Sequence, residues 1–195
     1  EGKGSRLVKL IRKYVKNMLT EMYDYDHEDC MRKMYWGVGG SGVVVLCTED
    51  NTIYMQQRSY EVNGGQGKWG FPGGGIHTEQ PKHHKTPIKH SVNHEDPVLE
   101  LQAFKELEEE AGYRGIPKYR LLDALVSYED CGFIFKTFII DIPYNEKRSW
   151  QPQPYPEHAW EIISQNWFSG KDWKNEDIYF GFTDVLINKI DSYIG

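Results

Sequence analysis

The stretch at residues 105–113, KELEEEAGY, constrains this chain more than any other. If residues 101–111 form a helix, Glu106, Glu109 and Glu110 stand at positions i, i+3 and i+4 and share one arc of its surface. Such closely spaced carboxylates repel one another unless cations neutralise them, and hard oxygen ligands suit Mg²⁺ or Mn²⁺. The spacing therefore predicts a divalent-metal platform, although it also fits a solvated Glu-rich face. The apolar side chains expected to pack on the other side are Leu101, Phe104, Leu107 and Ala111.

A glycine-rich segment at residues 64–75 precedes this helix, with seven glycines and one proline in twelve positions. Glycine permits positive φ and close approach of the backbone, and Pro72 fixes one turn. The composition predicts an irregular loop that aims peptide groups at a metal or a phosphate. A glycine-rich loop alone is a weak signal, but in front of a Glu-rich helix it becomes a strong one.

Together these two segments resemble the Nudix box, a Pro-Gly-Gly loop followed by a spacer and the pattern Arg-Glu-aliphatic-any-Glu-Glu-any-Gly-aliphatic. Residues 105–113 place three Glu, Leu107 and Gly112 in register with that pattern. The Ala111-Gly112 pair is also a typical helix stop.

The chain departs from the box in two places. Lys105 replaces the box Arg, and a Lys lacks the planar fork that binds a carboxylate bidentately. Gln80 stands where the pattern expects a Glu, and a His-rich insertion at residues 77–94 lengthens the spacer. Either Glu79 or Glu95 is left to supply that carboxylate, and Glu95 precedes an Asp-Pro pair that is typical of a helix start. The insertion itself is either a mobile polar loop or a lid that meets phosphate or ribose.

The resemblance implies an α/β protein with the Nudix fold, an α/β/α sandwich around a mixed sheet. The expected domain covers residues 36–195, with the box loop and helix at 67–113. Residues 1–35 are expected to add a basic amphipathic helix and an acidic linker. Hydrophobic patterns predict strands at 41–47, 52–58, 119–128, 131–142 and 160–168, and a closing helix at 181–194. The second of these strand pairs is expected to turn at Glu129-Asp130.

The resemblance also implies an activity, the Mg²⁺-dependent hydrolysis of the pyrophosphate bond in a nucleoside diphosphate linked to another group. ADP-ribose, a dinucleotide and an NTP are examples of such substrates, and Mn²⁺ is expected to substitute for Mg²⁺. Glu109 and Glu110 are implied as metal ligands and Glu106 as a ligand or base. The other expected site residues are Lys105 as a catalytic residue, Gly74 and Glu95 at the metal, and Arg58, Gly73, Gly74 and Gly75 at the substrate. One further carboxylate is expected from Glu129, Asp130, Glu157 or Glu161.

Two other functions remain open at this stage. Lys105 and the interrupted box fit a Nudix-fold nucleotide-binding or sensor module that has lost catalysis. The basic helix expected at residues 5–22 fits an RNA decapping enzyme, with capped RNA as a partner. For Arg58, an ion pair with a carboxylate competes with a phosphate contact.

The composition limits the classes of function and the cellular compartment that we expect for this chain. A net charge of −6 and a pI near 5.7 argue against a general nucleic-acid binder. The three cysteines are scattered without metal-ligand spacing, so a reducing, cytoplasmic compartment is expected. No apolar run approaches the length of a membrane span, so no membrane partner is expected. The oligomeric state is not indicated.

Overall fold

The computed structural model describes residues 39–62, 64–76, 97–113, 118–130, 133–179 and 183–195. The expected N-terminal helix, the acidic linker and the insertion at 77–94 lie outside these ranges, as do Glu79, Gln80 and Glu95. The domain boundary between residues 35 and 36 therefore stays a prediction. No helix within the described ranges is both long enough and apolar enough to cross a membrane.

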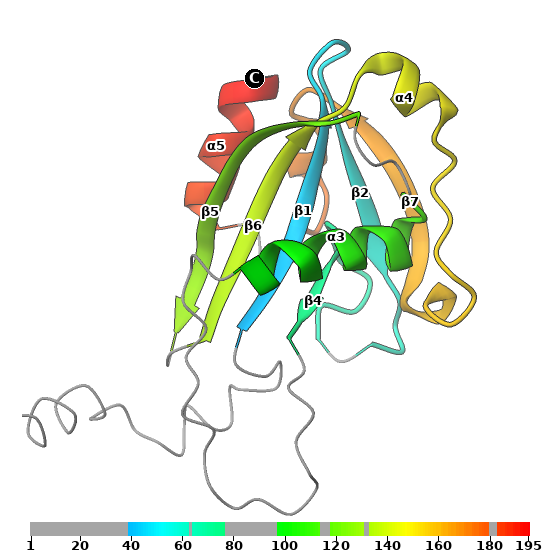
Figure 1. Ribbon diagram of the computed structural model, residues 1–195. Helices are drawn as coiled ribbons and strands as arrows, with labels where there is room; N and C mark the ends of the chain where they lie inside the picture. The colour runs from blue at the N-terminus through cyan, green and yellow to red at the C-terminus, as the bar shows by residue number, and fades with distance from the viewer. Residues whose placement is uncertain (1–38, 63, 77–96, 114–117, 131–132, 180–182) are drawn as a thin grey trace, which may run out of the picture. The chain divides into compact units, whose positions relative to one another are not determined.

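The described residues form a mixed β-sheet in the order β3-β2-β1-β6-β5, with β4 paired to β1 and β7 paired to β2 (Figure 1). The β1 and β6 strands run parallel, and the other pairs are antiparallel. All nine residues of β1 are buried, as expected for a central strand covered on both faces. The strand bounds are β1 Gly39–Cys47, β2 Thr52–Arg58, β3 Trp69–Gly70, β4 Gly73–Gly75, β5 Arg120–Asp130, β6 Phe133–Asp141 and β7 Ile162–Ser169.

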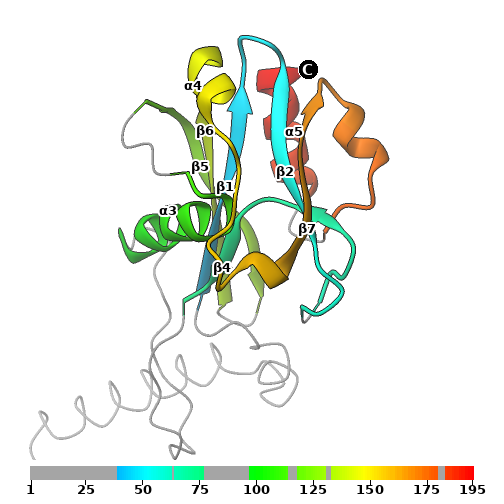
Figure 2. The same cartoon turned by 90° about the vertical axis from the view of Figure 1, so that its right-hand side faces the viewer.

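Two helices cover opposite faces of this sheet, which confirms the expected α/β/α sandwich. Figure 2 shows α3 (Pro97–Ala111) on one face and α5 (Asp184–Ile194) on the other. Because side chains alternate along a strand, Val43 and Val45 of β1 pack in the cluster under α3, whereas Val44 and Leu46 pack in the cluster under α5. The shorter helices are α4 (Tyr144–Ser149), η1 (Ala159–Glu161) and η2 (Asp172–Asn175).

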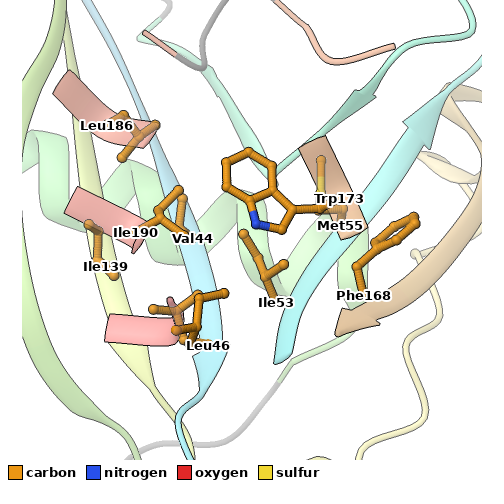
Figure 3. Packing of buried hydrophobic residues seen from close by; sticks show 10 residues of the cluster. Val44, Leu46, Ile53, Met55, Ile139, Phe168, Trp173, Leu186 and Ile190 are labelled. Carbon is orange, nitrogen blue, oxygen red and sulfur yellow. The ribbon is translucent and has the colours of Figure 1, made fainter. Parts of the chain in front are cut away.

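The core on the α5 side is built around the fully buried Trp173 of η2 (Figure 3). Trp69 and Phe168 meet there edge to face, with ring centroids 4.9 Å apart. Thr183 caps α5, since its side chain accepts a hydrogen bond from the Leu186 amide. This layer contains none of the predicted site residues, so it serves as the scaffold for the other face.

Several expected boundaries were wrong. The glycine-rich segment is not wholly irregular, because it contains β3 and β4. The turn expected at Glu129-Asp130 is the end of β5, where these residues pair with Ile134 and Phe133. Trp160 lies in η1 rather than in a strand, and α4 is a short helix that the sequence patterns did not predict.

The outward faces of two helices carry exposed apolar side chains. Leu101 is 71 % exposed on α3, although it was expected to pack, and Val185 is 63 % exposed on α5. The helix begins at Pro97, four residues before the expected start, and its buried stripe runs through Leu99, Ala103 and Leu107 at i, i+4 and i+8. Leu101 stands off that stripe and faces outward.

Candidate active site

The C-terminal half of α3 carries the three predicted carboxylates and is fastened at its end. Gly112 ends the helix with a φ of 64°, so the predicted stop is confirmed. The last helical carbonyls find donors outside the helix: Gln153 N–H binds the Ala111 carbonyl at 3.1 Å and Tyr155 N–H binds the Glu109 carbonyl at 2.8 Å. These bonds satisfy groups that a helix end leaves free and fix the height of the carboxylates above the sheet.

Glu110 is buried, with 4 % of its surface exposed, although the spacing placed it on an exposed arc. The expectation failed because Glu110 stands three residues after Leu107, on the edge of the packing stripe. Its Oε2 accepts a hydrogen bond of 2.5 Å from Gln56 Nε2 and one of 3.2 Å from the Gly73 amide. Burial, followed by the charge of Glu106, raises the Glu110 pKa to about 8.

Glu106 lies one turn earlier and faces β4. Its carboxylate lies against Gly74, where a Cβ on residue 74 would come closer than 3.0 Å to its atoms. Gln102 Nε2 donates a hydrogen bond to Glu106 Oε1 from the preceding turn. Burial, followed by the charge of Glu109, raises the Glu106 pKa. Glu106 and Glu110 therefore meet the two neighbouring glycines Gly73 and Gly74.

Glu109 occupies the outer side of the cluster and has two nitrogen-bearing neighbours, Lys105 and His158. Lys105 Nζ lies 3.3 Å from Glu109 Oε2, and His158 Nε2 lies 3.8 Å from the same oxygen. The other nitrogen of His158 lies 3.1 Å from Glu161 Oε1. Lys105, predicted to be catalytic, is a half-exposed partner of Glu109. The sequence did not predict His158 at the site, because no periodic spacing relates it to α3, which ends at Ala111.

Among the outside carboxylates considered, Glu161 shares a neighbour with the box, because His158 contacts both Glu161 and Glu109. The charge of Glu161 raises the pKa of both Glu106 and Glu110. The other candidates are not brought there: Glu129 is exposed on the edge strand β5, and Glu157 is exposed in the connection before η1. The Asp130 side chain and all of Glu95 lie outside the described residues.

Arg58 and Gly75 complete the set of predicted residues. The ion pair considered for Arg58 is absent among the described residues. Its guanidinium lies 4.9 Å from the centre of the Tyr179 ring, and its Nε donates to the Gly64 carbonyl at 3.2 Å. Gly75 pairs with Gly40 of β1, which anchors β4 in the sheet. The substrate contacts of Arg58 and Gly75 stay predictions.

The donor set fits a hard divalent cation. Glu106, Glu109 and Glu110 project from one helix, and the buried Glu110 forms no ion pair with any described Lys or Arg. At present no three His, Cys, Asp or Glu side chains of the described ranges are arranged to share one ion. Each box carboxylate is instead held by its own donor, namely Gln56, Gln102 or Lys105. Closely spaced carboxylates repel one another unless a cation lies between them, and the oxygen donors present here are of the kind that Mg²⁺ prefers.

Gly74→Ala is expected to lower the hydrolytic activity that the resemblance implies, with little loss of stability. Gly74 has no positive φ, and the atoms that a Cβ would meet belong to the movable end of Glu106. Displacing that carboxylate should lower kcat by roughly 10- to 100-fold, because misplacement by about 1 Å is enough for such losses. Steady-state kinetics and thermal unfolding would be measured together.

The control is Gly73→Ala, whose Cβ would lie 2.9 Å from backbone atoms of Ser41 and Gly42. Backbone of a central strand cannot yield as a side-chain end can, so this variant should lose stability as well. Wild-type kcat in a folded Gly74→Ala protein would contradict a role for Glu106 at β4.

Comparisons with known proteins agree on the fold. No family model and no curated protein matches the sequence. Among solved structures, the Nudix hydrolase RenU from M. smegmatis has a TM-score of 0.56 at 17 % identity and covers 80 % of this chain and 87 % of its own. A C. elegans Ap4A hydrolase, solved as a binary complex, has a TM-score of 0.51 at 14 % identity, with coverage of 79 % and 96 %.

A third solved structure is the NUDIX domain of NrtR from Shewanella oneidensis, in complex with ADP-ribose. Its TM-score is 0.50 at 16 % identity, and the match covers 89 % of this chain and 97 % of that domain. These neighbours share the fold that the described residues build around β1. This chain therefore has the fold of the Nudix hydrolases.

Proposed function

We propose that this protein is a Mg²⁺-dependent hydrolase of the pyrophosphate bond in a nucleoside diphosphate linked to another group. The observation that carries the proposal is the convergence of Glu106 and Glu110 on Gly73 and Gly74, with Glu109 one step away on the same helix. This convergence brings together the two halves of the box that the sequence keeps apart. A solvated Glu-rich face would not bury one carboxylate at 4 % exposure.

The residues of the site have distinct parts in this proposal. Glu109 and Glu110 would hold the cation, with Glu161 as a further carboxylate from η1. The cation, when bound, polarises phosphoryl oxygens and lowers the pKa of an attacking water. Glu106 either joins the cation ligands or accepts the proton of that water. In this proposal the peptide groups of β4 would face the substrate phosphates.

The substrate class follows from what the fold neighbours bind or cleave. One neighbour is named as an Ap4A hydrolase and another was solved with ADP-ribose, and both molecules contain phosphoric anhydride bonds. ADP-ribose, a dinucleotide or an NTP is accordingly the substrate we propose. Loops near the site decide among them, since base contacts come from residues outside the box.

A nucleotide-binding module without catalysis is the second candidate. It is favoured by Lys105, which pairs with Glu109 by a single exposed contact of 3.3 Å, and by the ADP-ribose bound in the NrtR domain. The two functions differ in one measurement, because a binding module would retain ADP-ribose without Mg²⁺-dependent turnover. The third expectation, RNA decapping, rests on a helix outside the described residues.

The proposed activity is tested by adding and removing the metal. Hydrolysis of ADP-ribose, dinucleotides and NTPs should be absent in chelator and return with Mg²⁺ or Mn²⁺, because the carboxylate cluster repels anionic phosphate unless a cation lies between them. Product formation would be followed by chromatography over this substrate panel. Full turnover in chelator would contradict the proposal, and binding without turnover at saturating Mg²⁺ would favour the binding module.

A further inference from the structure

Glu110 is held by an arrangement of amides on β2 and β7. Gln56 of β2 and Gln165 of β7 are direct partners in the strand ladder. Gln56 donates to the Glu110 carboxylate at 2.5 Å, and Gln165 donates to the Glu110 backbone carbonyl at 3.2 Å. The two amides therefore hold the same residue at both ends, by its side chain and by its peptide group.

The orientation of the Gln56 amide has a cost that fold stability does not explain. Gln56 is 3 % exposed, and its Oε1 has no hydrogen-bond partner. A buried oxygen without a partner costs on the order of 1–3 kcal/mol. Rotating the amide would aim that oxygen at Glu110, where it would repel the ionised carboxylate that binds a metal ion, because both are acceptors. The observed orientation of the Gln56 amide therefore provides a hydrogen bond to the Glu110 carboxylate and leaves the oxygen of the amide without one.

In the described part of the chain, no Lys or Arg side chain forms an ion pair with the Glu110 carboxylate. Lys105, the nearest candidate on α3, lies against Glu109, and its side chain is 60 % exposed. A neutral donor orients a carboxylate without placing a protein cation beside it, so that no protein charge competes with a metal ion. An ion pair at the same position would compete with the metal for that charge.

We propose that Gln56 is a positioning residue that holds the Glu110 carboxylate for the divalent cation, with Gln165 supporting it through the backbone. The inference rests on the proposed function only in that Glu110 is taken as a metal ligand. In this proposal a side chain of β2, and not α3 itself, sets the orientation of the Glu110 carboxylate.

The test is Gln56→Met, which keeps the length and volume of the side chain and removes the donor. Partners that orient a ligand typically change metal affinity by about 10- to 100-fold when they are lost. Mn²⁺ binding to the full chain, followed by the electron paramagnetic resonance of the free ion, should weaken by about tenfold or more. The Mn²⁺-induced rise in Tm should shrink in parallel.

The matched control is Gln57→Met, one residue further along β2. Gln57 Nε2 donates to the Gly67 carbonyl at 2.9 Å, so this variant loses a comparable hydrogen bond that does not involve Glu110. It should bind Mn²⁺ as the wild type does. A double variant separates positioning from packing: in a Glu110→Gln background, Gln56→Met should cause no further loss of Mn²⁺ affinity.

Two results would overturn the inference. One is wild-type Mn²⁺ affinity in a folded Gln56→Met protein, and the other is an equal loss in Gln57→Met. Failure of the proposed function looks different. A wild-type protein whose Mn²⁺ affinity depends on Glu110 and Gln56, but which hydrolyses no substrate, would support the inference and contradict the activity.

Discussion

Glu109→Gln and Glu110→Gln should each lower the rate of hydrolysis by ~10²-fold or more while the fold is retained. Each substitution keeps the shape of the side chain and removes one negative charge from the cluster on α3. At position 110 the substituted amide can still accept the hydrogen bonds from Gln56 and Gly73, so the packing is preserved. The measurement is kcat at saturating substrate as a function of Mg²⁺ concentration.

Glu108→Gln is the matched control for both variants. Glu108 lies on the same helix, and its substitution removes the same charge. It is exposed, and its carboxylate accepts a hydrogen bond from Tyr155, in the segment that follows α4. Its kcat should stay within a few-fold of the wild type. If all three variants have similar kcat values, the charge of the helix as a whole acts on the reaction and no specific ligand set exists.

Local patterns in the sequence predicted most of the sheet. The run at 41–47 and the alternation at 52–58 are signals carried by neighbouring residues, and both lie within the strands β1 and β2. Glu129 and Asp130 mislead the same method, because their composition is typical of a turn while the ladder with β6 keeps them in a strand. Pairing with a neighbouring strand is information that a single segment does not contain.

The site was predictable as far as one helix and one loop could show it. Glu106, Glu109 and Glu110 follow from the spacing on α3, and the stop at Gly112 follows from its freedom to adopt positive φ. The burial of Glu110 depends on Gln56 and Gly73, which come from separate strands. No periodicity marks a glutamine on a strand as the partner of a helix thirty or more residues away, and the same holds for His158.

Glu110 should also make the stability of the metal-free protein depend on pH. The folded protein keeps its proton up to a pKa of about 8, whereas the unfolded chain releases it near 4.5. Unfolding therefore releases a proton between these values, and the free energy of unfolding falls as pH rises through that window. With about 1.4 kcal/mol for each pKa unit, the loss from Glu110 is on the order of 5 kcal/mol.

Urea unfolding in chelator at pH 5 and pH 8 would measure this dependence. Glu110→Gln carries no proton to release, so it should differ little from the wild type at pH 5 and be more stable at pH 8. Glu106 shifts in the same direction and remains in both proteins, so the difference between them isolates position 110. Equal slopes with pH in the two proteins would contradict the burial of an unneutralised carboxylate.

Metal should narrow the difference in stability between the two proteins at pH 8. A cation that binds only the folded state stabilises it by about 2.7 kcal/mol at a hundred times its Kd. Mg²⁺ should therefore raise the free energy of unfolding of the wild type and leave Glu110→Gln nearly unchanged. Glu110 would then lower the stability of the metal-free protein and couple folding to metal binding, because its buried charge is stabilised by a neighbouring cation.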